Sequence, residues 1–171
     1  MNQRIESALN KQVNAELYSA YLYLSMSIWC ESKNLKGFAN WLRVQYQEET
    51  AHALKFFDYI LERGGLVKLE NIDAPPSGWK DLIEIFEQVL HHEKHVTSLI
   101  NNLVHIAIEE KDYATQNMLQ WFVNEQVEEE ASATEILEQL RLFEGKGAPL
   151  FMMDRELKQR VFVPIDSEKS E

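Results

Sequence analysis

The five residues Glu48-Glu49-Thr50-Ala51-His52 offer the clearest chemistry in this sequence of 171 residues. Glu49 and His52 stand three positions apart, so on a helix, which turns by about 100° per residue, their side chains leave one face. A hard carboxylate beside an imidazole is a ligand pair for a first-row metal ion inside a helical bundle. Glu-x-x-His is common by chance, so the motif becomes specific only if other helices bring carboxylates to the same depth.

Glycine and proline are scarce, with 6 and 4 residues, and they cluster at a few joints along the chain. Between the joints, apolar residues recur with the 3.6-residue period of a helix. We predict helices at about 2–32, 36–63, 113–144 and 149–158, and a further one that ends near Lys111. Ser77 is the predicted N-cap of that further helix, and Asp112 is the predicted N-cap of the next one.

The lengths of the joints predict how the helices are connected. Residues 33–35 form a joint short enough to force an antiparallel hairpin. The segment at about 66–78 is long enough to travel the length of a bundle and to start the third long helix parallel to the second. The sequence therefore predicts an all-α fold, a four-helix bundle with one long crossover and a short fifth helix at the C-terminus.

Composition limits the classes of protein that remain. The length predicts one domain at 1–160, followed by a polar tail at 161–171. Seventeen basic and 28 acidic residues give a formal charge of −11, which argues against nucleic-acid binding and is compatible with gathering cations. No apolar run approaches the ~18 residues of a membrane span, and no hydrophobic signal segment is evident. A single cysteine, Cys30, favours a reducing cytoplasm.

The other predicted helices supply the further metal ligands that the first motif requires. Each brings polar groups near its middle, where helices of an antiparallel bundle sit at similar depth, and each group falls in an apolar row. Buried charges cost several kcal/mol unless they are paired or metal-bound, so a divalent cation is their natural counter-charge. These candidate ligands are Glu16, Glu93, Gln126 and Glu129.

Three stretches of the chain resemble the bacterial non-haem ferritins, and the likeness extends over about residues 1–160. The stretches are Asn14–Tyr23, Glu48–Ala53 and Trp121–Glu130. The resemblance implies that the predicted bundle is the ferritin-like one. It also implies that Glu16, Glu49 and His52 hold one iron, while Glu49 bridges to a second iron held with Glu93 and Glu129. Gln126 sits beside the pair in this family and helps to place water or dioxygen.

The resemblance implies two further features of the centre. A third iron site involves Glu48, Glu125, Glu128 and Glu129, and the helical spacing of these residues agrees with shared faces. Tyr23 follows Glu16 by seven residues and resembles a tyrosine that supplies an electron or limits radical escape. Packing is the alternative for Tyr23, and a solvated acidic face is the alternative for the third-site glutamates.

The implied function is an iron-storage ferroxidase, which oxidises Fe(II) with dioxygen or peroxide and keeps ferric oxyhydroxide in a shell of twenty-four subunits. Thr50 follows the bridging glutamate where haem-binding relatives have methionine, so we predict no haem. A peroxide-consuming protein of the rubrerythrin type is one rival; the single cysteine argues against it. A helical scaffold or mini-ferritin that mainly binds and shields other molecules is another rival. Its metal site lies between subunits and has fewer ligands within one bundle, so the complete ligand set predicted here argues against it.

Four residues outside this constellation invite a functional interpretation. His91, His92 and His95 look like a metal cluster, but His92 and His95 flank the row of Glu93 instead of sharing it. We therefore predict a surface or interface role for them. Cys30 is predicted to be an inert thiol near the end of the first helix.

Overall fold

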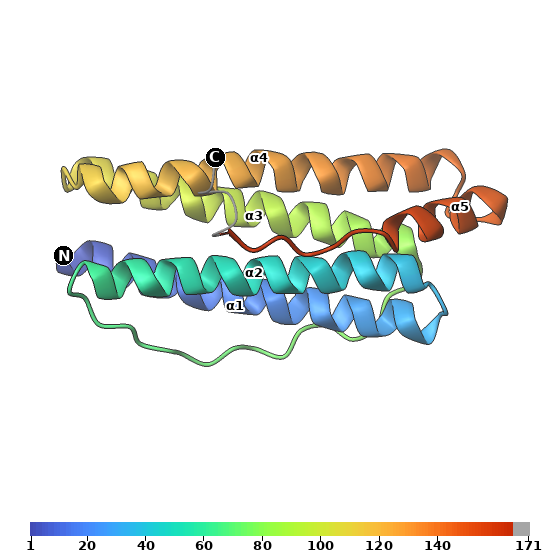
Figure 1. The fold of residues 1–171 in the computed structure, drawn as a ribbon, viewed down its shortest axis with the longest axis horizontal. Coiled ribbons are helices and arrows are strands. Elements are labelled where there is room, and N and C mark those ends of the chain that lie inside the picture. Colours follow the sequence, from blue (N-terminus) through green and yellow to red (C-terminus); the bar gives the residue numbers. More distant parts are fainter. Residues whose placement is uncertain (166–171) are drawn as a thin grey trace.

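A computed structural model describes residues 1–165 of the chain as four long helices and a short fifth one (Figure 1). The first two long helices form one antiparallel hairpin and the next two form another, so the predicted four-helix bundle with a short fifth helix is confirmed. The helices are α1 (Gln3–Ser32), α2 (Lys36–Glu62), α3 (Leu82–Glu109), α4 (Tyr113–Leu142) and α5 (Gly147–Leu157).

The long crossover between α2 and α3 runs along the outside of the bundle (Figure 1). Gly64 starts it in the left-handed region, with φ of +69°, a conformation that glycine adopts without a steric penalty. Asn10 of α1 fastens it, because its side-chain amide donates to the carbonyl of Leu66 at 3.0 Å and accepts from the backbone N–H of Lys68 at 2.6 Å. The crossover therefore brings α3 into the bundle parallel to α2, as predicted.

The predicted start of α3 is wrong by several residues. Its N-cap is Asp81, whose carboxylate accepts from the backbone N–H of Glu84 at 2.9 Å, and Ser77 remains in the crossover. Ser and Asp are comparable caps, and Asp81 carries the advantage of a charge that favours the positive end of the helix dipole. The predicted cap of α4 is confirmed, since Asp112 accepts from the N–H of Thr115 at 3.0 Å.

The apolar core divides into two clusters at opposite ends of the bundle. One contains Phe38 and Phe86, and the other contains Phe56 and Phe122. The residues between them on each long helix include buried polar and charged side chains. The fold therefore closes a polar layer between two dry ends, where water cannot screen its charges.

The short helix α5 is docked on the start of α2 by Asp154. Its carboxylate accepts from the backbone N–H groups of Gly37 at 2.8 Å and Phe38 at 3.1 Å, and so caps α2 from outside. The two backbones come so close that a Cβ on Gly37 would lie 1.6 Å from the carbonyl oxygen of Asp154. This close approach explains why a lone glycine stands at the start of a helix.

We expect Gly37→Ala to force α5 away from α2 and to lower the thermal midpoint of the iron-free protein. Loss of the Asp154 cap alone costs about 1–2 kcal/mol of stability. Gly78→Ala is the matched control, because a Cβ there meets no atom within 4 Å. Equal midpoints for the two variants, measured by calorimetry, would contradict this account of α5.

The segment that follows α5 turns back along the bundle beside α2 (Figure 1). We call residues 158–165 the C-terminal strap. Asn40 of α2 fixes its start, because the side-chain amide donates to the carbonyls of Leu157, Lys158 and Arg160. Of the predicted tail, residues 161–165 form part of the strap, and residues 166–171 lie outside the described part of the chain. Within residues 1–165, no helix is both long and apolar enough to span a membrane.

Candidate metal centre

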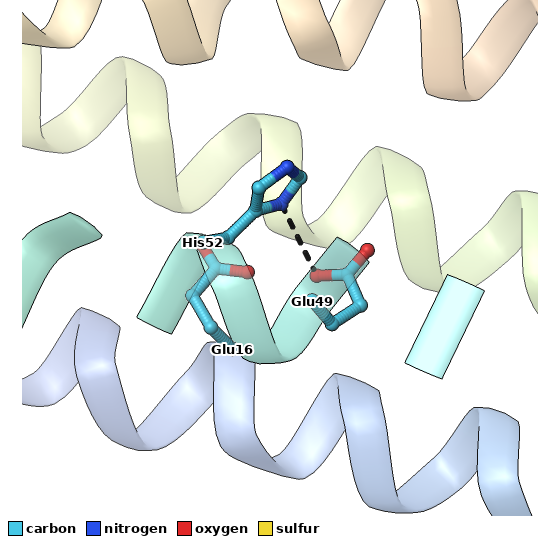
Figure 2. Close-up of side chains that lie close together, drawn as sticks. All are labelled: Glu16, Glu49 and His52. Atoms are coloured by element: carbon cyan, nitrogen blue, oxygen red, sulfur yellow. Dashed lines mark ion pairs between the residues drawn. The ribbon is translucent and has the colours of Figure 1, made fainter. Parts of the chain in front are cut away.

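Glu16 of α1 and Glu49 and His52 of α2 meet in the polar layer between the two apolar clusters (Figure 2). Each offers one ligand atom, and these atoms lie within 4.8 Å of one another. Nδ1 of His52 stands 3.6 Å from Oε2 of Glu49. The three side chains are only 1%, 1% and 3% exposed. The predicted convergence of two helices on one buried point is thus present in the structure.

The hydrogen bonding of this trio leaves room for a cation. Oε1 of Glu16 accepts from the side-chain amide of Gln12 at 2.8 Å. Oε2 of Glu16 and Oε1 of Glu49 are buried and have no hydrogen-bond partner among the described residues. A buried acceptor without a partner costs about 1–3 kcal/mol, and more when it is charged. Together with the imidazole of His52, these two carboxylates form a donor set that fits a divalent first-row metal.

Glu93 of α3 and Gln126 of α4 lie on the other side of the layer, held by a hydrogen-bond network. The Tyr23 hydroxyl donates to the Glu93 carboxylate. The Gln126 amide donates to the other carboxylate oxygen of Glu93 at 3.1 Å. On α4, Glu129 accepts from the side-chain amide of Gln45 at 2.7 Å. These bonds orient the carboxylates of Glu93 and Glu129 toward the layer from α3 and α4.

Among the described residues, the group whose ligand atoms all lie within 4.8 Å of one another contains Glu16, Glu49 and His52 but neither Glu93 nor Glu129. They nevertheless interact with it electrostatically. The pKa of Glu49 is raised well above its ordinary value by burial first, and then by the charges of Glu93 and Glu129. All four long helices therefore contribute to one electrostatically connected site.

The crowding of acids shifts the protonation of the whole layer. Burial, followed by the charge of Glu49, raises the pKa of Glu16 well above its ordinary value. Burial, followed by the charge of Glu129, raises the pKa of Glu93 to about 8. Without a cation the Glu93 carboxyl therefore holds a proton near neutral pH. Burial and the charge of Glu49 favour the protonated form of Glu16 as well, and a bound divalent ion favours release of such protons.

The four glutamates that the sequence predicts for a third iron site line a separate pocket of about 190 Å³ between α2 and α4. Glu48, Glu125, Glu128 and Glu129 all line it, together with His52 of the buried trio. Burial raises the pKa of Glu48 to about 7, even though the positive charge of Arg160 acts to lower it. The structure thus brings the four predicted glutamates to one pocket that touches the centre.

Three residues that the sequence analysis did not single out shape these sites. Gln12 and Gln45 hold Glu16 and Glu129 in place, and each stands four positions before a candidate ligand, so helical spacing could have indicated them. Arg160 forms an ion pair with Glu48 at 2.6 Å. Nothing in the sequence around Arg160 indicated that contact, because it depends on where the C-terminal strap lies.

The histidines and the cysteine follow the predictions in part. His91 and His95 are exposed, which agrees with a surface position. His92 differs: it turns inward, its Nε2 lies 2.8 Å from Oγ of Ser19, and its ring packs edge-on against Tyr23. Its position on α3, next to the row of Glu93, brings it against α1 rather than into solvent. Cys30 is buried, and burial raises the pKa of its thiol to about 12.

Comparison with known proteins places this arrangement in a family. Residues 6–143 match the protein family described as the ferritin-like domain. A bacterial non-heme ferritin of Bacteroides fragilis is 45% identical over 160 residues, covering 94% of this chain and 99% of that protein. A bacterial non-heme ferritin of Escherichia coli O157:H7 is 40% identical, covering 87% of this chain and 90% of that protein. An engineered closed form of the Archaeoglobus fulgidus ferritin superposes with a TM-score of 0.94 at 53% identity, covering 95% and 99% of the two chains.

A bundle with a long crossover and a buried carboxylate and histidine cluster defines the class of ferritin-like metal proteins. The match over most of the chain, with substantial identity to several ferritins, is more specific than the fold. The chain belongs to the ferritin family. The predicted resemblance to bacterial non-haem ferritins is confirmed, and with it the predicted function of iron storage with ferroxidase activity.

Proposed function

We propose that Glu16, Glu49 and His52 bind one Fe(II), and that Glu49 bridges to a second Fe(II) bound by Glu93 and Glu129. The observation that carries the proposal is the compact group of ligand atoms that Glu16, Glu49 and His52 form, in which one buried oxygen of each glutamate has no hydrogen-bond partner among the described residues. An ion bound by the two carboxylates offsets the repulsion between their charges.

The second position draws on α3 and α4. Gln126 orients the carboxylate of Glu93, and Gln45 orients that of Glu129. Both carboxylates are therefore preorganised for iron binding. We assign Gln126 the placing of water or dioxygen beside the pair. Its amide already reaches Glu93 at 3.1 Å and Thr97 at 3.3 Å, which fixes it at the edge of the layer.

The chemistry follows from the donor set. Carboxylate oxygens are hard ligands that stabilise Fe(III) over Fe(II), so Fe(II) bound here becomes a better reductant. Four Fe(II), one O₂ and six waters yield four FeO(OH) and eight protons, with four electrons passing from iron to oxygen. Peroxide is the alternative oxidant, accepting two electrons from each iron pair. The oxidised ions leave as ferric oxyhydroxide, the stored product.

Tyr23 is proposed to act beside the iron pair. Its hydroxyl donates to Glu93, and its side chain is completely buried. Burial, together with the charges of Glu93 and Glu49, raises the pKa of Tyr23 well above its ordinary value, so the phenol keeps its proton. A buried phenol in contact with a ligand is placed to give an electron or to contain a radical before it reaches the rest of the bundle.

We further propose that Glu48, Glu125, Glu128 and Glu129 form a third iron site. Support comes from their shared pocket, which also touches His52 and therefore adjoins the first position. Thr50 stands where haem-binding relatives have methionine, and its hydroxyl donates to the carbonyl of Tyr46 within α2. The absence of haem stays a prediction.

The proposed assembly is a hollow shell of twenty-four chains. Phe151 and Met152 of α5 are 71% and 72% exposed in the single chain, which is apolar surface that an assembly would cover. The proposed compartment is the cytoplasm, supported by the one cysteine of the chain, Cys30, which is a buried free thiol and not part of a disulfide.

Sedimentation mass combined with iron loading tests the storage proposal. We expect a particle of roughly half a megadalton, because the proposed closed shell contains twenty-four chains of 20.0 kDa each. Anaerobic Fe(II) addition followed by air should load many irons per chain and turn the solution amber. A small particle that retains only two irons per chain would instead favour a peroxide-consuming di-iron protein.

A further inference from the structure

Arg160 of the C-terminal strap is held in a fixed position by α2. Its backbone carbonyl accepts from the side-chain amide of Asn40 at 2.9 Å. Its guanidinium lies 4.7 Å from the centre of the Trp41 ring, and one nitrogen donates to the Trp41 carbonyl at 3.5 Å. A cation over an indole face is attracted by the ring, so these contacts place the guanidinium before any metal arrives.

The same guanidinium reaches into the third-site pocket. Its other terminal nitrogen donates to Oε2 of Glu48 at 2.6 Å, a short charge-assisted bond. Among the described residues that line the pocket, Arg160 is the only arginine or lysine, facing the carboxylates Glu48, Glu125, Glu128 and Glu129. Arg160 therefore brings a positive charge into this acidic pocket, directly against Glu48.

The strap also covers the pocket with apolar side chains. Phe162, Val163 and Ile165 line it opposite the acids of α2 and α4. Both partners of the ion pair are about three-quarters covered, at 26% and 23% exposure for Arg160 and Glu48. Partial removal of water strengthens each charge interaction in the pocket compared with one on an open surface.

We infer that Arg160 is an internal counter-cation of this pocket that competes with Fe(II) for Glu48 and thereby sets the metal affinity of the third site. The inference rests on the proposed third site and adds the residue that controls it. Iron binding at Glu48 then requires the guanidinium to leave that carboxylate. The contacts with Asn40 and Trp41 do not involve Glu48, so the strap stays attached while the pocket exchanges one cation for another.

Competition of this kind limits how long iron stays in the pocket. A site of four carboxylates with no resident cation would hold a ferric or ferrous ion tightly and would impede its passage to the interior. A tethered guanidinium weakens the site by a modest factor and is always present to replace a departing ion. Arg160 thus acts on iron transfer through Glu48 and does not itself touch the two irons proposed to react with oxygen.

The test measures Zn(II) binding, which involves no oxidation, to the intact iron-free protein by calorimetry, with the occupied sites located by anomalous scattering. We expect Arg160→Gln to tighten Zn(II) at the third site about tenfold, the scale of one partly buried ion pair. Arg160→Lys keeps the charge and should stay within about threefold of the parent. Arg155→Gln, which removes an exposed arginine from α5, is the matched control and should change nothing.

A second variant separates charge from coverage. Phe162→Ala loosens the apolar side of the strap but retains Arg160. Equal tightening in Phe162→Ala and Arg160→Gln would show that coverage matters and would overturn the role of the charge. Three Zn(II) per chain with one unchanged third-site affinity in parent and Arg160→Gln would overturn the inference and leave the third site standing. Only two Zn(II) per chain in every variant would refute the third site itself, and the inference with it.

The crystals used to locate the metal supply an independent readout. In the parent, Zn(II) at the third site should be accompanied by separation of the Arg160 guanidinium from Glu48, while its place over the Trp41 ring is retained. A zinc peak among the four glutamates with the 2.6 Å ion pair still intact would contradict direct competition.

Discussion

Replacing Glu49 and His52 together by alanine is expected to slow the initial oxidation of Fe(II) by at least about a hundredfold. Loss of outer groups that merely support a metal ligand already costs about 10–100-fold, and this variant removes two ligands. Glu49 matters most, because the proposal places it on both irons. Stopped-flow absorbance of the ferric product, after an anaerobic Fe(II)-loaded sample is mixed with oxygenated buffer, measures the rate.

The control for this variant removes the same residue types from exposed positions. Glu62→Ala with His105→Ala loses one carboxylate and one imidazole from solvent-facing parts of α2 and α3. The far-UV circular dichroism of both double variants should match that of the parent, because the apolar clusters at the two ends of the bundle are untouched. Oxidation at the parental rate in the Glu49 and His52 variant would refute the site assignment.

The bundle could be predicted from the sequence because the patterns that specify it, apolar spacing and helix ends, are local and recur in each helix. Each long helix carries its apolar residues at helical spacing over seven or more turns, and the joints contain glycine or capping residues such as Gly64 and Asp112. Such a pattern has one low-energy arrangement, in which the apolar stripes face each other. Depth in the bundle was predictable too, since Glu16, Glu49 and Glu93 stand near mid-helix.

Features that depend on tertiary contacts were not predictable. The start of α3 at Asp81 rather than Ser77 was a choice between two comparable caps. The C-terminal strap has no periodic pattern, and its course is fixed by Asn40 and Trp41, more than a hundred residues earlier in the chain. Arg160 therefore could not be connected with Glu48 from the sequence.

The centre itself was only partly predictable for the same reason. Helical spacing brings Glu49 and His52 together, because both lie on one element. Whether Glu93 closes on them depends on side-chain rotamers, and these are set by Tyr23 and Gln126 from two other helices. The residues that could supply ligands were thus readable from the chain, whereas their distances required the folded structure.

The iron-free protein is expected to lose thermal stability as the pH rises from about 6 to about 9. The pKa of Glu93 in the folded protein is about 8, raised from an ordinary value of 4.5 by burial and by Glu129. In this pH range the folded state therefore binds a proton that the unfolded state has already released, and stability falls as pH rises. The contribution is complete below the ordinary value and is lost as the pH passes about 8. Glu16 and Glu49, whose pKa values are also raised, act in the same direction.

The size of this effect is on the order of a few kcal/mol, since each unit of pKa difference corresponds to about 1.4 kcal/mol. Scanning calorimetry of the iron-free protein at several pH values measures it, and Glu93→Gln should flatten the slope by removing one of the titrating groups. Saturating Zn(II) should weaken or reverse the slope, because the metal takes the place of the protons and its binding strengthens as they leave. A thermal midpoint of the iron-free parent that stays level or rises from pH 6 to 9 would mean that these acids are not held together in the folded protein. The burial and mutual repulsion of these carboxylates thus destabilise the metal-free protein at neutral and higher pH, and the same unfavourable interactions favour the binding of iron.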